Sequence, residues 1–196
     1  IHAAAAAFGF GAPPLIEGLE FEDDNLSPEV ALNYYINDDT SVYVAYKKAF
    51  KSGGIDNSAL PTASINPLSP TFAGFDALIY DSEEADGFEI GLKSNLLNNS
   101  MRLNATYYKY EYTDLQVQLF DAAIIQFSTF NAGAVETEGF EADVLWNTDI
   151  EGLTLRGQFA WTDATNTGDF ITPGGENLKG SKRSYSPEIA GSFGLS

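Results

Sequence analysis

The chain has 196 residues, long enough for one domain with a sizeable core. Its 10 basic and 28 acidic residues give a net charge of −18, which argues against DNA or RNA as a partner, because phosphate binding needs clustered Lys and Arg. The absence of Cys and the single His argue against a disulfide scaffold, a Cys nucleophile and a His-rich metal site, so we expect no cofactor and no bound metal.

Residues 1–25 have a loop-like composition, with three Gly, two Pro and a run of acidic residues at the end. No apolar run in the chain approaches the roughly 20 residues that a membrane helix needs, whereas a transmembrane β-strand needs only about 9–11 residues of alternating character. At the other end, Ser186–Ser196 has the pattern of a strand that stops in mid-alternation. We therefore expect the chain to be a piece of a longer protein.

The first regular pattern is a hairpin that starts near Ser27. Apolar and other residues alternate up to Ile36, a tight turn follows at Asn37–Thr40, and a second strand covers Ser41–Phe50. Both faces of this hairpin are mixed in polarity, so the sequence does not assign its inner face.

Gly and Pro then interrupt the pattern over Lys51–Ser82, a loop long enough to indicate a function. Three aromatic residues lie in this loop rather than on a strand: Phe72, Phe75 and Tyr80. Exposed loop aromatics can stack on the rings of a solute or can pin the loop to itself.

The longest β-pattern runs from Phe88 to Phe120, as two strands joined by a turn at Leu97–Ser100. The returning strand stays β-compatible to about Phe120, whereas strands of soluble domains have mostly about 5–6 residues. This length predicts that the strands span something thick.

Three further strands follow the hairpin. They are expected over Ala132–Trp146, over Leu153–Trp161 and from about Pro187 to the end, with a short turn at Asn147–Gly152 and a long link at Thr165–Tyr185. Along the whole chain, short and long links alternate, with an intermediate link at Asp121–Phe127. Outer-membrane barrels keep short periplasmic turns at one end and long extracellular loops at the other, so the pattern predicts an all-β antiparallel meander of long strands within a transmembrane barrel.

Charged residues fall on the strand faces opposite the apolar stripes, where a barrel would point them into its lumen. This lumen-facing set is Glu89, Lys93, Arg102, Glu141, Asp143 and Arg156. The residues could pair with one another, contact a plug or line a solute path. Glu141 and Asp143 share a strand face, but without a nearby His or Cys they do not make a convincing acid/base pair, and we predict no enzymatic activity.

Two other groups are candidates for binding. Aromatic residues near strand ends fit the interfacial girdles of a barrel or the cross-strand pairs of a soluble sheet. In the last long link, Lys179, Lys182 and Arg183 form a basic cluster that could face an anionic ligand.

Several of these segments resemble the barrel of TonB-dependent receptors of the Gram-negative outer membrane. Each match alone is weak, and their order and spacing from Leu26 onward are fairly specific. The matching segments are Leu26–Glu29, Val42–Lys47, Phe50–Gly54, Glu89–Lys93, Tyr112–Gln116, Asn131–Ala134, Gly139–Glu141 and Ser186–Glu188.

The resemblance implies about seven of 22 strands, from the C-terminal part of the barrel but short of its end. Residues 1–25 would be an extracellular loop-like segment and residues 26–196 a partial barrel in outer-membrane lipid. The resemblance also implies partners outside this chain, the TonB system and the receptor's own plug, and a scarce, small or medium-sized solute. Ferric siderophores are the first cargo implied, with oligosaccharides and cobalamin behind.

Two other functions stay open at this point. A secreted acidic β-sandwich for carbohydrate binding or adhesion would bury its apolar stripes between two packed sheets. A glycoside-cleaving enzyme would place paired carboxylates in a cleft.

Overall fold

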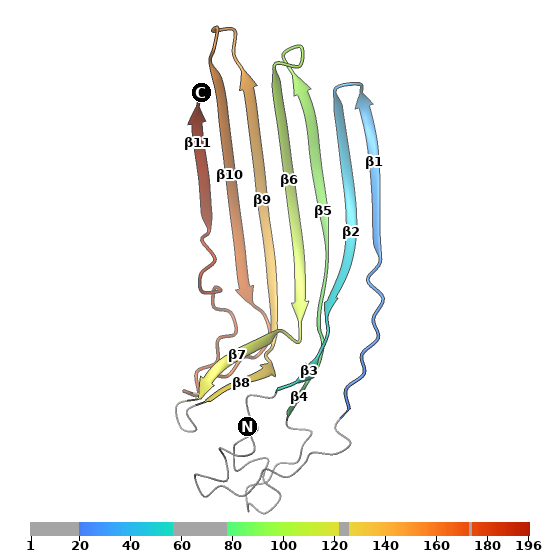
Figure 1. Ribbon diagram of the computed structural model, residues 1–196, viewed down its shortest axis with the longest axis vertical. Coiled ribbons are helices and arrows are strands. Elements are labelled where there is room, and N and C mark those ends of the chain that lie inside the picture. Colours follow the sequence, from blue (N-terminus) through green and yellow to red (C-terminus); the bar gives the residue numbers. More distant parts are fainter. Residues whose placement is uncertain (1–19, 57–77, 122–125, 173) are drawn as a thin grey trace, which may run out of the picture. The chain divides into compact units, whose positions relative to one another are not determined.

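The computed structural model describes residues 20–56, 78–121, 126–172 and 174–196. These residues form two compact units. The larger unit, formed by 25–50, 84–115 and 133–196, holds a seven-stranded sheet in the order β1-β2-β5-β6-β9-β10-β11 (Figure 1). Its strands are β1 (Glu29–Asn37), β2 (Thr40–Lys51), β5 (Glu83–Leu96), β6 (Met101–Thr113), β9 (Ala134–Asn147), β10 (Thr154–Asn166) and β11 (Ile189–Leu195).

The all-β antiparallel fold predicted from the sequence is confirmed, and the described residues form no helix long and apolar enough to cross a membrane. Short turns join β1 to β2, β5 to β6 and β9 to β10, and long links join the other neighbours in the sheet. The turn between β5 and β6 is made by Leu97, Asn98 and Asn99, all at positive φ, a conformation that Asn tolerates better than most residues. The predicted alternation of short and long links is therefore present.

The smaller unit holds two short hairpins. One pairs β3 (Gly54–Ile55) with β4 (Ile79–Tyr80), and the other pairs β7 (Gln116–Asp121) with β8 (Gln126–Asn131). Polar side chains tie these strands together: the Asp56 carboxylate accepts a bond from the Thr129 N–H at 2.7 Å, and the Asn131 amide donates to the Asp81 carbonyl at 2.9 Å. Leu78 is buried beside them.

The long strand expected to return as far as Phe120 is divided in the structure. β6 ends at Thr113, Asp114 has a φ of +52°, and the chain resumes as β7, which pairs with β8 instead of continuing alongside β5. Residues 116–120 are β-compatible, as predicted, but they belong to another sheet. The alternation of side chains in the sequence does not show that a strand ends at such a residue and that the next strand joins another sheet.

Register gives the seven-stranded sheet one apolar face and one polar face. In β1 and β2, whose faces the sequence left unassigned, Leu32 lies opposite Val44 and Asn33 lies opposite Tyr43. What we call the apolar face carries Val30, Leu32, Val44, Phe88, Ile90, Leu103, Tyr107, Phe140, Val144, Leu155, Phe159, Trp161, Ile189 and Phe193. What we call the polar face carries Tyr43, Lys47, Glu89, Lys93, Arg102, Asn104, Thr106, Tyr108, Tyr110, Glu141, Asp143, Arg156, Gln158, Thr162 and Ser192.

Candidate functional site: two faces of one sheet

Large side chains of the apolar face are exposed even on the central strands. Ile90 is 50% exposed, Phe88 and Phe159 are 45% exposed, and Leu32 on the edge strand is 70% exposed. Monomeric soluble proteins rarely leave such a large contiguous apolar surface uncovered. A β-sandwich requires a second sheet over this face, and the described part of this unit contains none.

Aromatic side chains lie toward both ends of the apolar face, as Trp146 alone at the turn end and as a row at the loop end. At the turn end, Trp146 lies between Met101 and Leu155, and toward the loops Phe140 lies between Tyr107 and Trp161. Leu155 and Trp161 are six positions apart on β10, which is about 20 Å at about 3.4 Å per residue. This length runs along the strand, and with the tilt of about 35–45° of barrel strands it corresponds to a height of about 15 Å, which fits within the apolar band of about 25 Å on membrane barrels.

Beyond the loop-side aromatic row, the same face becomes charged. Lys109 pairs with Glu136 at 2.9 Å, the Tyr107 hydroxyl donates to Glu138 at 3.1 Å, and Lys48 lies 3.5 Å from Glu84. We call these residues and the Asp163–Lys182 pair the charged band. The change from aromatic rings to ion pairs within two residues marks where the apolar surface ends.

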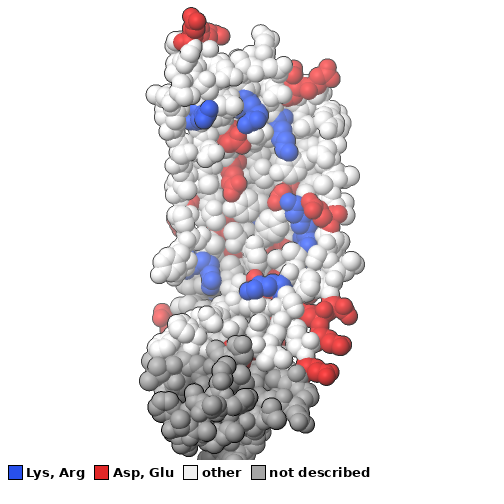
Figure 2. Space-filling view, in the orientation of Figure 1, with Lys and Arg blue, Asp and Glu red and all other residues white. Residues whose placement is uncertain are grey.

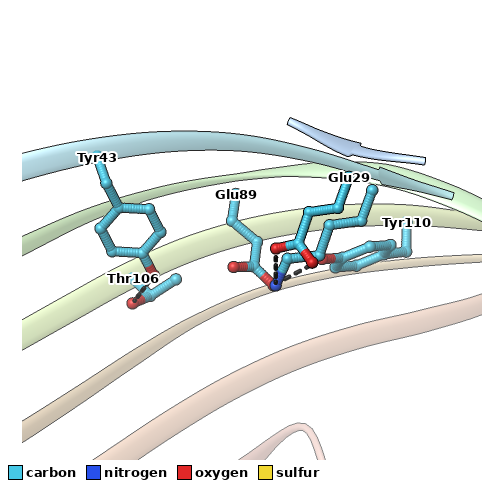
Figure 3. A network of polar contacts seen from close by, with 6 residues as sticks. Glu29, Tyr43, Glu89, Thr106 and Tyr110 are labelled. Atoms are coloured by element: carbon cyan, nitrogen blue, oxygen red, sulfur yellow. Dashed lines mark hydrogen bonds and ion pairs between the residues drawn. The ribbon is translucent and has the colours of Figure 1, made fainter. Parts of the chain in front are cut away.

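The polar face is held by hydrogen bonds that cross strands. The Lys47 ammonium lies 3.0 Å from Glu89 and 3.9 Å from Glu29, and the Tyr110 hydroxyl donates to Glu89 at 2.6 Å (Figure 3). Because Glu89 is bonded from both sides, it is fixed in the wall of the sheet.

Tyr side chains on this face lie over Gly residues of the next strand. Tyr43 of β2 packs on Gly91 of β5 and reaches Thr106 of β6, with 3.1 Å between the two hydroxyls (Figure 3). The arrangement recurs two strands further on, where Tyr108 covers Gly139 and lies 3.1 Å from the Thr162 hydroxyl. The register also places Tyr108 and Tyr110 on the face away from the apolar rows, so only Tyr107 of these three belongs to those rows.

All six residues predicted to face a lumen lie on the polar face. The Asn104 amide donates to both carboxylate oxygens of Asp143, each at 3.1 Å. The Lys93 ammonium lies over the Tyr43 ring, 5.4 Å from its centre. Glu141 and Asp143 share this face, as the sequence indicated, and Glu141 is exposed. The described residues contain no group of three or more His, Asp or Glu placed to hold a metal ion.

The three loop cations are directed to different partners. Lys182 pairs with Asp163 and lies 3.8 Å from Glu188, and its attraction to Asp163 raises the pKa of the Lys182 ammonium. Lys179 lies 3.7 Å from Asp169, whose pKa is lowered by the Asn177 amide and by this lysine.

Arg183 bonds the Asn166 side chain at 3.4 Å, and Asn166 is a buried residue of the polar face. The side chains of Arg183 and Lys182 thus bind residues on opposite faces of the sheet. The spacing in the sequence could not separate them, because neighbouring residues in an irregular link have no fixed facing.

Of the three loop aromatics, only Tyr80 lies within the described residues, and Phe72 and Phe75 lie outside them. Tyr80 is a residue of β4 paired with Gly54, so its placement in a loop was wrong. Its ring packs against Gly54, which is the pinning alternative for such a residue.

Comparisons with known proteins agree with this two-faced sheet. Residues 7–196 match the family model for the TonB dependent receptor-like beta-barrel, whereas no curated protein matches. Among solved structures, the sheet is similar to the ferric yersiniabactin uptake receptor FyuA from Yersinia pestis, at 17% identity and a TM-score of 0.61, over 85% of this chain and 22% of that one.

Two further solved structures are similar to the same extent. The siderophore receptor PiuA from Acinetobacter baumannii has 18% identity and a TM-score of 0.59, over 84% of this chain and 22% of that one. The copper transporter OprC has 16% identity and a TM-score of 0.57, over 86% of this chain and 23% of that one. The chain thus spans about a fifth of the length of these proteins. With a family model matched over nearly all of its residues, the chain belongs to the TonB-dependent receptor β-barrel family.

Proposed function

We propose that this chain is part of the wall of an outer-membrane receptor that takes up a scarce solute with energy supplied through TonB. The exposed apolar band carries the proposal, because an apolar surface about 20 Å long along the strands, with Trp146 at the turn end and an aromatic row at the loop end, fits the hydrocarbon layer of a bilayer. The polar face then turns to a lumen, and the long links lie on the extracellular side. The protein's own plug would fill that lumen, since 22-stranded transporters have a plugged interior.

For the cargo we propose a ferric siderophore. FyuA is described as a ferric yersiniabactin uptake receptor, PiuA as a siderophore receptor and OprC as a copper transporter, and the chain is similar to all three at TM-scores between 0.57 and 0.61. Fold similarity alone does not distinguish these cargoes, since function depends on the site rather than on the fold. Solute capture would use the loop residues, and no covalent chemistry is needed.

The test is uptake by the full-length receptor in a Gram-negative host without its own siderophore receptors. Cells are given radio-iron-loaded siderophores of several chemical classes and, separately, radiolabelled copper. We expect accumulation of at least one ferric siderophore that disappears when TonB is deleted. Accumulation that persists without TonB contradicts the energised mechanism, and accumulation of copper alone contradicts the proposed cargo.

The three loop cations have different partners, and this difference allows a more specific prediction about solute capture. The sequence-predicted candidates for solute contacts are Lys179, Lys182, Arg183 and the aromatics Phe72, Phe75 and Tyr80, and of the three cations we propose Arg183 alone. Of the cations, Arg183 has the geometry to face the lumen. We expect Arg183→Ala to weaken binding of an anionic ferric siderophore about tenfold, the effect of losing about 1.4 kcal/mol.

Lys182→Ala is the matched control, because it removes the same charge one position away on the opposite face. It should change the dissociation constant by less than about threefold, as expected for exposed ion pairs. The measurement is equilibrium binding to cells at constant receptor density. Equal losses in the two variants would show that the facing of these side chains does not matter, and no loss in either would exclude this cluster from capture.

A further inference from the structure

Two arginines near the turn end of the polar face have no acidic partner in the described part of the chain. Arg102 of β6 and Arg156 of β10 each lie directly opposite Leu145, which is on β9 between them. Both arginines are exposed, and the ion pairs of the described residues all use lysines. Since adjacent strands are about 4.8 Å apart, the two side chains start about 10 Å apart on one row.

The hollow around this arginine pair is lined by both polar and apolar residues. Arg102 and Arg156 line one hollow of about 440 Å³, together with Asp143, Gln158 and Ser192. The carboxylate of Asp143 already accepts the Asn104 amide at 3.1 Å.

Three of the ten basic residues lie near the turn end of the polar face, although the turns beside them carry Asp38, Asp39, Asp149 and Glu151. On the rows nearest the turns, the polar face carries Lys93, Arg102 and Arg156 against Glu141 and Asp143, so the sum is 3 − 2 = +1. Figure 2 shows basic side chains gathered at this end of the sheet, with acidic ones beside them. The two guanidiniums without an acidic partner, rather than the net charge of this end, fit an anionic partner.

We propose that Arg102 and Arg156 bind carboxylates of the polypeptide segment that plugs the lumen of the receptor. A guanidinium presents its N–H donors in a fork that matches both oxygens of a carboxylate. Once the lumen is filled, a cation without a partner would lose hydration and gain nothing in return, so the plug must supply acidic groups there. Leu145 gives the segment an apolar contact between the two charged ones.

A fixed carboxylate suits this position better than an anionic solute in passage. Arg102 is the second residue of β6 and Arg156 the third of β10, so both lie beside the short turns. In outer-membrane barrels those turns are periplasmic, which is the side where a solute must leave. Two guanidiniums would retain an anion at that exit, whereas a permanent internal contact has no need to release. The inference rests on the proposed function, because it requires a barrel with a plug.

The test places a photo-reactive benzoylphenylalanine at Leu145 of the full-length receptor in its native membrane. The control places the same group at Trp146, the next residue on the other face. After illumination, the cross-linked peptides are identified by mass spectrometry. We expect position 145 to capture a plug peptide of the same receptor that contains Asp or Glu, and position 146 to capture none.

Charge reversal then tests the arginines themselves. Arg102→Glu combined with Arg156→Glu should lower the cross-linking yield at position 145 about tenfold, and the double Lys substitution should restore part of it. Capture of no plug peptide, capture of one without Asp or Glu, or an unchanged yield after reversal would overturn the proposal. If the reversed receptor does not assemble, shown by loss of heat-modifiable migration in gels, Arg102→Gln combined with Arg156→Gln, which removes both charges and adds none, should give a similar loss of yield, and an unchanged yield would overturn the proposal.

Uptake measured in the same cells separates this inference from the proposed function. TonB-dependent uptake without a plug cross-link at position 145 refutes the arginine contact alone. A cross-link to an acidic plug peptide without TonB-dependent uptake supports the contact and refutes the transport function.

Discussion

Arginine in place of Phe159 should lower the free energy of unfolding of the receptor barrel in phospholipid vesicles by about 2–4 kcal/mol. Phe159 lies inside the apolar band, opposite Ala142 and Gly191, and its ring is 45% exposed on the face that we assign to lipid. A cation at that depth loses its hydration and finds no partner in hydrocarbon. The measurement is denaturant unfolding of the full-length receptor, followed by tryptophan fluorescence.

Gln158→Arg is the matched control, because it places the same side chain at the same depth on the opposite face. Gln158 is an exposed residue of the polar face and lies opposite Asp143. We expect this variant to stay within about 0.5 kcal/mol of the parent, as most exposed substitutions do. A Gln158→Arg receptor that loses as much stability as the Phe159→Arg receptor would show that the two faces are assigned incorrectly.

The apolar face could be predicted from sequence in most strands because it depends on a local pattern. Along β10, Leu155, Phe159 and Trp161 alternate with polar residues, and a strand must place such residues on one side. In β1 and β2 the pattern was mixed, and only the pairing of Leu32 with Val44 and of Asn33 with Tyr43 resolved it. Register is a property of two strands, so one strand's pattern cannot supply it.

The wall contacts were not predictable for a related reason. Glu89 and Arg102 were recognised as polar-face residues, but the partners of Glu89 are Lys47 and Tyr110, which lie 42 and 21 positions away. The end of β6 before Asp114 likewise depends on a backbone conformation of Asp114 that the neighbouring residues do not encode. Sequence therefore identified the faces of the strands from β5 onward and missed how the strands are bound to one another.

The Tyr-over-Gly packing is the clearest such contact, and it yields the second large effect. A Cβ at Gly139 would lie 2.5 Å from the Tyr108 ring and 2.7 Å from the Trp161 carbonyl oxygen. The ring could turn away, but it would lose the Thr162 hydroxyl, and the carbonyl belongs to the backbone of β10. We expect Gly139→Ala to destabilise the barrel by about 1–3 kcal/mol, as overpacking does.

Gly194→Ala is the control for this change. It adds the same methyl group on the same face of the sheet, but on β11, where a Cβ would have nothing within 4 Å. It should alter the free energy of unfolding by less than about 0.5 kcal/mol. Tyr108→Ala combined with Gly139→Ala should recover only part of the loss, since it removes the ring and leaves the carbonyl contact. Full recovery would assign the whole cost to the ring, and equal effects at positions 139 and 194 would mean that Tyr108 does not rest on β9 in the assembled barrel.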